Sequence, residues 1–510
     1  MLRNVPPVLA RLAALVVLCS ALAPAAARAQ SQATTGDIEG RVLDPNGAVV
    51  TNATVTATNK ATGFEKSATT DEDGNYRLIL LPPGTYAVRA TASGFSAAES
   101  SAVTVTVGSK TALDMSLAVG GASVSVTVTS EAPTVETTRT SVATTINQQA
   151  IENLPINGRN FQDFATLSPA VVRDPRGGDL SVGGQRGTLN SLQVDGVDNN
   201  NTFFGQALGR GGVRPPYQFS EESVQEFQVN QNGFSAEFGR AGGAVINVVT
   251  KSGTNAFHGG LFEYFRDESL NANDPVTKAN QARAGRPNKR PPSKIHQFGG
   301  RVGGPIVENR AFFFFTYDGQ RADVPQVLDV PNIATAPLAA RNVLLPKLDT
   351  YQVGRNQDVF LGKADISLNT ANQLTLRYNH QGFTGRNNEN NGPLSAEEHS
   401  GDSIVKSDTF SGTLASTLTQ AVVNEFRFQF ARDKEPGEAN SDQPEAVIGT
   451  GAGTNLSIGR NNFSPRETTI KRVQFIDNLS YVRGRSTFKF GADLNFDRIL
   501  NFFPGLFSGS

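Results

Sequence analysis

The segment "LQVDGVDNNNTFFG", residues 192–205, gathers side chains that could bind a metal ion or a ligand. Asp195 and Asp198 follow an aliphatic run of strand character, and three asparagines come directly after them. Carboxylate and amide oxygens are the ligands that hard cations prefer, so a cation loop is one interpretation. Asp-Gly is also a turn signal, because glycine accepts a positive φ and aspartate hydrogen-bonds its own turn. These residues alone leave a metal loop, a binding pocket and a structural turn open.

No other part of the chain carries the signature of a common enzyme class. There is no Walker A run, no dinucleotide-binding glycine fingerprint, no H-E-x-x-H and no G-x-S-x-G. The four histidines, at positions 258, 296, 380 and 399, are too scattered to suggest a zinc site. Carboxylate pairs such as Glu221-Glu222 are typical of solvated loops. We therefore expect a protein that is not an enzyme and that has no catalytic residues, no metal and no cofactor.

Composition and the N-terminus indicate an exported protein of several domains. The chain has 510 residues, a formal net charge of −1 and one cysteine, which gives no basic bias toward nucleic acid. Residues 1–29 have the layout of a secretory signal peptide with cleavage after Ala29, and an N-terminal anchor helix is the alternative. Cys19 lies in this segment, so no disulfide is expected in the exported chain. Beyond it, no run of about 18 apolar residues occurs, so a membrane-spanning role requires a β-barrel.

Residues 36–118 alternate with a period of two and are punctuated by turn sequences such as Pro-Asn-Gly and Pro-Pro-Gly, which predicts an antiparallel β-sandwich. Asp71 and Asp73 could suggest calcium, but Gly74 comes too early for an EF-hand loop, so a hairpin turn is favoured. The segment resembles the carboxypeptidase regulatory-like domain, a transthyretin-like sandwich akin to starch-binding domains. The match is carried by Gly40, Val42, Asp44, Gly47, Asp73, Gly74, Tyr76, Leu78, Pro83, Gly84 and Tyr86.

Residues 120–250 predict a mixed α/β module. "INQQAIENL" has helical spacing after a threonine cap, "NGRNFQDFATLSP" supplies a second short helix, and strands follow between glycine-rich loops. "LQVDGVDNN", "SVQEFQV" and "AEFGRAGGAVINVVTKSGTN" resemble the plug domain of TonB-dependent outer-membrane transporters, in their Oar-like branch. The residues that carry this plug signature are Asp195, Gly196, Glu237, Gly239, Gly242, Gly243, Asn247, Thr250 and Lys251.

The resemblance implies roles for two segments around the plug. It makes Asp195-Gly196 a turn at a strand end and directs the following loop outward as a ligand site, with Asn199, Asn200, Asn201, Phe203, Phe204 and Arg210 as candidates. It also places the TonB box, which the periplasmic protein TonB binds by strand addition, just before the plug. The candidate box is Ser123, Val124, Ser125, Val126, Thr127, Val128 and Thr129. The same strand could instead close the preceding sandwich.

Residues 251–510 alternate apolar and polar side chains in strand-length segments. In "VNEFRFQFAR" the phenylalanines at 426, 428 and 430 point one way, while Glu425, Arg427 and Gln429 point the other. "NQLTLRYNH" repeats this with Arg377 on the polar side. A soluble sandwich would show the same periodicity. The secretory signal, the lack of cysteine in the exported chain, the charged opposite face and the 32 phenylalanines favour an antiparallel transmembrane β-barrel, which the resemblance also implies. About ten strands fit this length, against about 22 in the family, so we expect only the first part of a barrel and a truncated sequence.

The expected protein is therefore mainly β: a transthyretin-like sandwich, a mixed α/β plug and a partial outer-membrane barrel. The resemblance implies a TonB-dependent receptor in the outer membrane of a Gram-negative cell, with TonB and membrane lipid as partners. It would take up, or export, a ligand such as a carbohydrate or peptide. The alternative is a secreted or surface β-sandwich protein for adhesion or carbohydrate binding. The polar stretch from Arg266 to Lys294 is expected to be a mobile extracellular loop.

Overall fold

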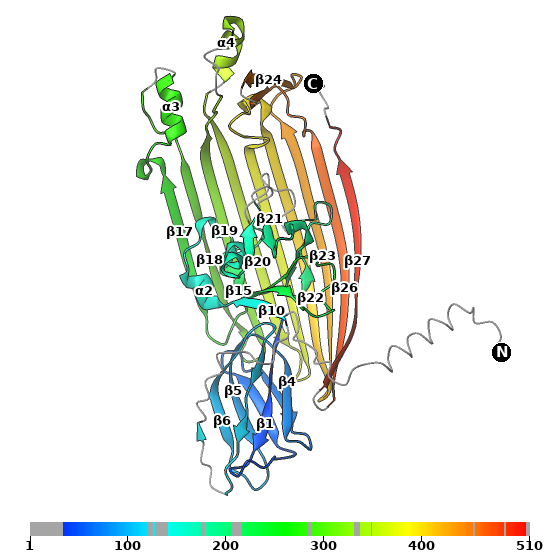
Figure 1. Cartoon of the computed structure of the whole chain (residues 1–510). Helices are drawn as coiled ribbons and strands as arrows, with labels where there is room; N and C mark the ends of the chain where they lie inside the picture. Colours follow the sequence, from blue (N-terminus) through cyan, green and yellow to red (C-terminus); the bar gives the residue numbers. More distant parts are fainter. Residues whose placement is uncertain are drawn as a thin grey trace, which may run out of the picture.

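The computed structural model describes residues 34–120, 126–127, 141–174, 179–205, 217–283, 287–330, 337–347, 349–451, 454–483 and 486–505. Three parts follow one another along the chain: a small sandwich, a mixed module, and a wide sheet of long strands that curves behind that module (Figure 1). The predicted signal peptide lies outside the described residues. Within those residues, no helix is long and apolar enough to cross a bilayer.

The sandwich packs two sheets around one apolar core. One sheet has the order β4-β1-β7, with β8 also paired to β1; its strands are β1 (Gly36–Leu43), β4 (Asn75–Leu81), β7 (Lys110–Ala112) and β8 (Met115–Ser116). The other has the order β3-β2-β5-β6-β9 and comprises β2 (Thr54–Asn59), β3 (Glu65–Thr69), β5 (Gly84–Thr91), β6 (Ala98–Val105) and β9 (Val126–Thr127). Alternate residues of both sheets fill the core, among them Ile38, Val55, Leu78, Tyr86 and Val88.

The turn at residues 71–74 has a simple structural role. Asp71 Oδ1 accepts hydrogen bonds from the backbone amides of Asp73, at 3.0 Å, and Asn75, at 2.8 Å, so its carboxylate stabilises its own turn. The turn does not close a hairpin, as the sequence suggested, because β3 and β4 belong to different sheets of the sandwich. It is a connection between the two layers.

The mixed module contains a five-stranded sheet in the order β10-β15-β16-β13-β14. Its strands are β10 (Val142–Ile146), β13 (Ser191–Val194), β14 (Val197–Asp198), β15 (Val224–Asn232) and β16 (Val245–Thr250), with a small pair β11 (Val171–Arg173) and β12 (Leu180–Val182) beside it. The helices are α2 (Gln148–Asn153), η1 (Asn157–Arg159), η2 (Phe161–Leu167), η3 (Gly187–Leu189) and η4 (Glu221–Ser223). The N-cap of α2 is Asn147, whose side chain accepts from the Ala150 amide, and not the expected threonine.

The wide sheet has nine antiparallel strands in sequence order, close to the ten expected. They are β17 (His258–Asp267), β18 (Lys294–Val307), β19 (Ala311–Gln326), β20 (Tyr351–Ser367), β21 (Asn372–Glu389), β22 (Gly401–Thr419), β23 (Val422–Ala439), β26 (Arg466–Arg483) and β27 (Ser486–Phe502). Connections at the end beside the sandwich, here called the turn end, are short. Those at the opposite loop end are long and hold η5 (Glu268–Leu270), α3 (Pro275–Arg283), α4 (Leu338–Leu344), η7 (Leu345–Lys347), η8 (Glu397–His399), β24 (Ala446–Gly451) and β25 (Thr454–Ile458) (Figure 1).

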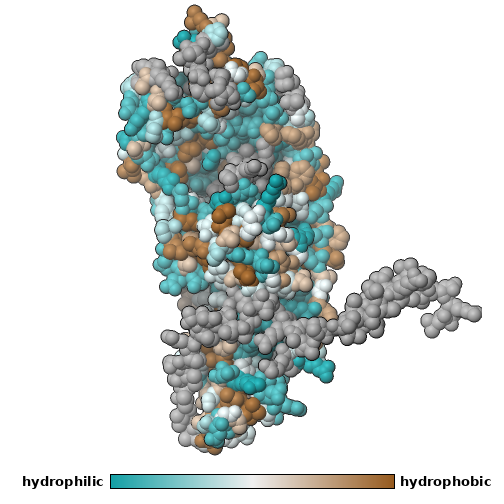
Figure 2. Space-filling view, viewed as in Figure 1, coloured by the Kyte–Doolittle hydropathy of each residue, from teal (hydrophilic) through white to brown (hydrophobic). Residues whose placement is uncertain are grey.

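The two faces of this sheet differ as the sequence alternation predicts. Arg377, Arg427 and Gln429 are buried on the concave face, which the mixed module covers, whereas Tyr378 and Phe430 are exposed on the convex face. Figure 2 shows hydrophilic side chains over the hollow of the concave face above the module. The run of four phenylalanines in β19 places side chains on both faces of the sheet, because Phe312 and Phe314 are buried while Phe315 is exposed. A polar interior and an apolar exterior are typical of outer-membrane barrels.

The sandwich contacts both the mixed module and the wide sheet at the turn end. Gln228 Nε2 of β15 donates to the Val107 carbonyl at 3.2 Å, and the Asn255 amide donates to the Ala61 carbonyl at 2.8 Å. Ile79 and Leu80 of the sandwich pack with Val423 of the wide sheet. The three parts are therefore joined by polar and apolar contacts at one end of the sheet.

Candidate ligand and coupling site

The Asp195-Gly196 turn joins β13 to β14 as a tight hairpin. Val194 pairs with Val197 across it, and Asp195 and Gly196 have φ values of 50° and 75°. Two successive residues with positive φ characterise the hairpin turn that Asn-Gly and Asp-Gly sequences favour. The structure thus places both residues in a turn, at the point where the mixed module meets the concave face of the wide sheet.

The Asp195 carboxylate is fully engaged with protein groups. Oδ1 accepts from the Thr250 amide at 2.9 Å, and Oδ2 accepts from the Thr250 hydroxyl at 2.8 Å. Oδ2 also accepts from Nη1 of Arg377 at 2.7 Å, across the interface with β21. Burial by itself would raise the pKa of Asp195, but Lys363, Arg377 and the Thr250 hydrogen bonds outweigh it and hold that pKa below its usual value. The ionised carboxylate therefore links the mixed module to the wide sheet, here called the wall.

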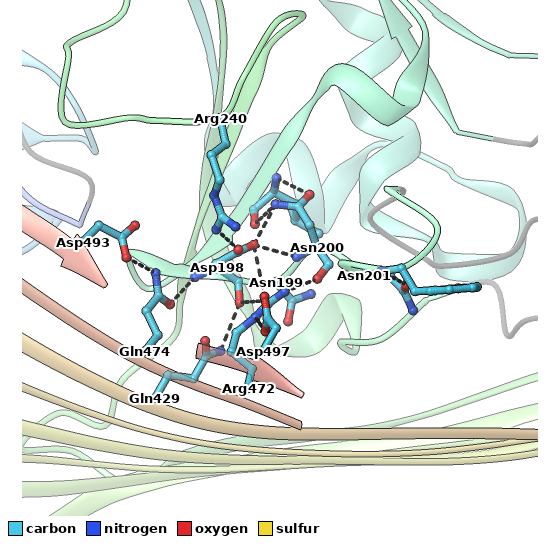
Figure 3. Close-up of polar contacts among 12 residues, drawn as sticks. Asp198, Asn199, Asn200, Asn201, Arg240, Gln429, Arg472, Gln474, Asp493 and Asp497 are labelled. Atoms are coloured by element: carbon cyan, nitrogen blue, oxygen red, sulfur yellow. Dashed lines mark hydrogen bonds and ion pairs between the residues drawn. The ribbon is translucent and has the colours of Figure 1, made fainter. Parts of the chain in front are cut away.

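Asp198 makes a second set of contacts with the wall (Figure 3). Its carboxylate pairs with Arg240 of the mixed module and lies 3.4 Å from Nη1 of Arg472 on β26. Its carbonyl accepts from Arg472 at 3.0 Å and from Gln429 at 3.1 Å, and its amide donates to Gln474 at 3.0 Å. Each of the two carboxylates is therefore paired with at least one arginine. Among the residues that the structure describes, no cluster of three or more metal-ligating side chains occurs.

The three asparagines that follow act as anchors of the loop. Asn199 donates to Gln218, and Asn200 donates to the Asp198 carboxylate at 2.7 Å. Asn201 donates to Glu435 on β23 at 3.1 Å, while its oxygen accepts from the amides of Phe203 and Phe204. The cavity beside these residues measures about 40 Å³, which is room for little more than a water molecule.

The remaining ligand candidates differ in position. Phe203 and Phe204 contact each other edge to face at 4.9 Å, and Phe203 is 43 % exposed. Phe203 therefore presents an aromatic surface to which a ligand has access. Arg210 lies outside the described residues.

The rest of the plug signature holds the module together and to the wall. Glu237 forms an ion pair of 3.1 Å with Lys489 of β27, and Lys251 forms one of 2.8 Å with Glu152. The amides of Gly242 and Gly243 both donate to the Leu189 carbonyl at 2.9 Å. A Cβ at position 243 would lie 2.5 Å from Asn190 Oδ1 and would displace that side chain, whereas Gly239 has open space around it. Asn247 is buried in the central strand β16.

The candidate TonB box is described only in part. Ser123, Val124, Ser125, Val128 and Thr129 lie outside the described residues. Val126 and Thr127 form β9, which pairs in parallel with Ala98 and Glu99 of β6. These two residues thus extend a sheet of the sandwich, in line with the alternative that the sequence left open.

A larger cavity lies at the loop end, away from the ligand candidates that the sequence named by residue. It measures about 490 Å³ and is lined by η5, by the start of α3 and by the end of β19, including Asn273, Val276, Thr277 and Arg290. Part of the stretch expected to be a mobile loop, Pro275–Arg283, forms α3, and Asp274 accepts from the amides of Val276, at 2.8 Å, and Thr277, at 3.0 Å, at its start. Asp274-Pro275 was the signal in the sequence, an N-cap followed by proline in the first turn.

Comparison with known proteins agrees with this architecture. Residues 37–118 match the carboxypeptidase regulatory-like domain, and residues 249–343 and 325–510 match an outer membrane beta barrel domain. The chain is 29 % identical over 316 residues to the TonB-dependent transporter Oar of Myxococcus xanthus, an alignment that covers 59 % of this chain and 28 % of that protein. The chain thus spans well under half the length of this relative.

The outer membrane transporter YddB from Escherichia coli has a similar fold. Its TM-score is 0.52 at 14 % identity, with 70 % of this chain and 48 % of that chain covered. The expected sandwich, plug and barrel are thus the architecture of the structure, and the mixed module is a plug. The chain belongs to the outer-membrane β-barrel family and is a homologue of TonB-dependent, Oar-like transporters.

Proposed function

We propose that this protein is a receptor that takes up a carbohydrate or peptide across the outer membrane, energised by TonB from the periplasm. The sandwich and the turn end of the barrel then face the periplasm, and the long connections of the loop end face the outside. Export of the ligand is the reverse use of the same passage. The Oar homology and the plug within the curve of the barrel sheet support this proposal.

One observation carries the proposal: polar and charged groups attach the plug to the barrel wall. Asp195 contacts Arg377, Asp198 contacts Arg472, and Glu237 contacts Lys489. Water can replace such contacts when a plug shifts within a wet lumen, whereas separating two apolar surfaces costs free energy in proportion to their area. Attachment by ion pairs and hydrogen bonds therefore suits a plug that must close the barrel and yet be displaced.

The loop-end cavity is the better candidate for ligand binding. Its volume of about 490 Å³ lies within the range of small-molecule sites, unlike the void beside Asn199 to Asn201. Asparagine, aspartate, glutamate, glutamine, threonine, serine and arginine line it together with prolines, an alanine and two valines. This mixture of hydrogen-bonding groups and small apolar surfaces suits a sugar or a short peptide.

We expect TonB to add a further strand beside β9. It is the last strand of the order β3-β2-β5-β6-β9, so in the described part of the chain its other edge has no partner strand. Strand addition uses main-chain hydrogen bonds and tolerates varied side chains. Binding of TonB to the segment Ser123–Thr129 therefore depends on an extended backbone with free amides more than on a particular sequence.

Calorimetry of the intact protein with a periplasmic TonB fragment tests the coupling. Val126→Pro removes an amide and should abolish binding, while Val126→Ala, the matched control, should bind as the wild type does. Deleting residues 123–129 should have the effect of the proline variant. No binding by the folded wild type, or equal binding by all three variants, would contradict TonB coupling through this segment.

Fractionation separates transport from the alternative of a surface adhesion protein. The protein should remain in the outer-membrane fraction after washing with high salt and with urea, because its barrel strands lie in the bilayer. N-terminal sequencing of that material should begin at Gln30. Release of the protein by either wash would favour an adhesive role.

A further inference from the structure

The convex face of the barrel sheet carries a row of like charges. Arg432 of β23 lies directly opposite Lys471 of β26, which lies directly opposite Arg498 of β27. One row nearer the loop end, Lys406 of β22 lies opposite Lys434 of β23. Neighbouring strands are about 4.8 Å apart, and like charges directly opposite each other destabilise a sheet. Five cations thus lie on four adjacent strands, and three of them, Arg432, Lys471 and Arg498, form one row.

These side chains point toward the membrane and not toward the plug. Arg432 and Lys471 are exposed, while Gln429 on β23 and Arg472 on β26, an odd number of residues away from them, are buried against the plug, as alternation along a strand requires. The next outward row toward the turn end is apolar: Phe430 lies opposite Val473, and Val473 opposite Phe496. The cations thus border the apolar band of the barrel on its loop side.

Acidic groups on the same face leave much of this charge unpaired. Glu467 forms an ion pair with Lys434 at 3.3 Å. Asp408 lies opposite Arg432 but accepts hydrogen bonds from Tyr378 and from the His380 ring, both at 2.7 Å. Among the described residues, no ion pair within 4.0 Å involves Lys406, Lys471 or Arg498. Asp402 and Glu438 face each other further toward the loops.

Another cation of the same sheet shows the usual arrangement. Lys294, at the loop end of β18, lies opposite Asp267 on one side and Asp323 on the other. Opposite charges across strands stabilise a sheet, so Lys294 faces carboxylates of the protein on both sides, one of which, Asp323, also pairs with Arg386. The row Arg432–Lys471–Arg498 has cations on both sides of its central residue instead.

We propose that this row binds the phosphate groups of an anionic lipid in the leaflet at the loop end. Guanidinium and ammonium groups at the edge of the apolar band match a phosphate at headgroup depth, where a charged side chain costs little. The acyl chains of the same lipid would lie along Phe430, Val473 and Phe496. The proposal goes beyond ligand uptake, since it gives the barrel wall a lipid site of its own.

Native mass spectrometry of the intact, detergent-solubilised protein tests it. The probes are phosphatidic acid and phosphatidylcholine with identical acyl chains. The wild type should retain phosphatidic acid and not phosphatidylcholine. Lys471→Gln should weaken retention about fivefold, the effect of one cation near a lipid phosphate. The matched control Lys294→Gln removes one charge at the same end of the sheet and should retain the lipid as the wild type does.

Three outcomes would overturn the proposal. They are equal retention of the two lipids by the wild type, equal weakening by Lys471→Gln and Lys294→Gln, and release of phosphatidic acid by excess inorganic phosphate, which would indicate a site for the free anion. Both variants should keep the wild-type circular dichroism spectrum. If Lys471→Gln does not fold, Arg498→Gln on β27 takes its place with the same expected result.

Discussion

Nη1 of Arg377, on the concave face of β21, donates a hydrogen bond of 2.7 Å to Oδ2 of Asp195 in the plug turn, across a sequence separation of 182 residues. Both side chains are buried, and Asp195 also holds Thr250 at the end of β16. The contact therefore links the barrel wall to two strands of the plug sheet at once. Displacement of the plug from the barrel wall must break it.

Replacing Arg377 should loosen the plug without unfolding the barrel. Arg377→Leu leaves the Asp195 carboxylate buried with one cation fewer, which costs about 3 kcal/mol in comparable buried pairs. Hydrogen–deuterium exchange should show faster exchange of the Thr250 amide, which donates to Asp195. The control is Arg386→Leu, because Arg386 pairs with Asp323 at 3.0 Å with both side chains more than half exposed. Such a pair contributes less than about 1 kcal/mol. Equal protection of the Thr250 amide in both variants would show that the Arg377–Asp195 contact does not hold the plug in place.

A methyl group should destabilise the plug when added at Gly196 in the turn and not when added at Gly239, elsewhere in the plug. Gly196 has a φ of 75°, and a Cβ there would lie 2.8 Å from the guanidinium of Arg427 on β23. Gly196→Ala should cost about 1 to 2 kcal/mol from backbone strain and displacement of the wall arginine. Gly239→Ala meets no atom within 4 Å and should be neutral. Limited proteolysis of the plug reads out both, and similar cleavage rates in the two variants would argue against strain at Gly196.

Local patterns predicted much of the fold because they depend on neighbours in the sequence. Alternation in "VNEFRFQFAR" put Arg427 and Gln429 on one face and Phe430 on the other, as the structure has them. Asp-Gly predicted the turn at Asp195, since φ preference belongs to the residues themselves. Sequence reasoning erred where two local signals competed, as at Asn147, which caps α2 in place of a threonine.

The partners of the site residues could not be predicted in this way. Arg377 and Arg472 reach Asp195 and Asp198 because strands far along the chain curve behind the plug, and nothing in the local sequence marks that contact. The asparagines at 199–201 looked like ligand groups because amides can bind either a ligand or the protein. Which of the two they bind depends on the wall opposite, where Glu435 accepts from Asn201.

Filling the loop-end cavity should impair ligand binding selectively. Val276 lines the cavity and is 40 % exposed, so Val276→Trp places a large ring in the cavity with little strain on α3. Lys278→Trp, on the exposed side of the same helix, is the control. Retention of maltooligosaccharides and of a tryptic peptide mixture should fall at least about tenfold for Val276→Trp, the loss of roughly 1.4 kcal/mol, and stay unchanged for Lys278→Trp. Unchanged retention in both would move the ligand site elsewhere.

The contact between sandwich and plug should weaken as pH rises. Burial raises the pKa of the Glu226 carboxyl to about 7 from its usual 4.5, and the hydrogen bond from the Val107 amide offsets only part of that rise. The docked state therefore keeps a proton that the separated state releases. Its stability is complete below about pH 4.5 and falls as pH rises through about 7, by about 3 kcal/mol at most.

Exchange of the Val107 amide, corrected for the intrinsic effect of pH, measures this dependence, because that amide donates to Glu226 across the contact. Protection should drop between pH 5 and about 8 in the wild type. Glu226→Gln keeps an acceptor oxygen and loses the titration, so its protection should vary little. A small residual slope is expected from Asp37, a second buried carboxyl of the sandwich whose pKa burial also raises. Glu65→Gln, at an exposed position of the same domain, should leave the wild-type profile intact. A flat wild-type profile, or one unchanged by Glu226→Gln, would mean that Glu226 stays ionised in the docked state and that its hydrogen bond from Val107 outweighs the cost of its burial.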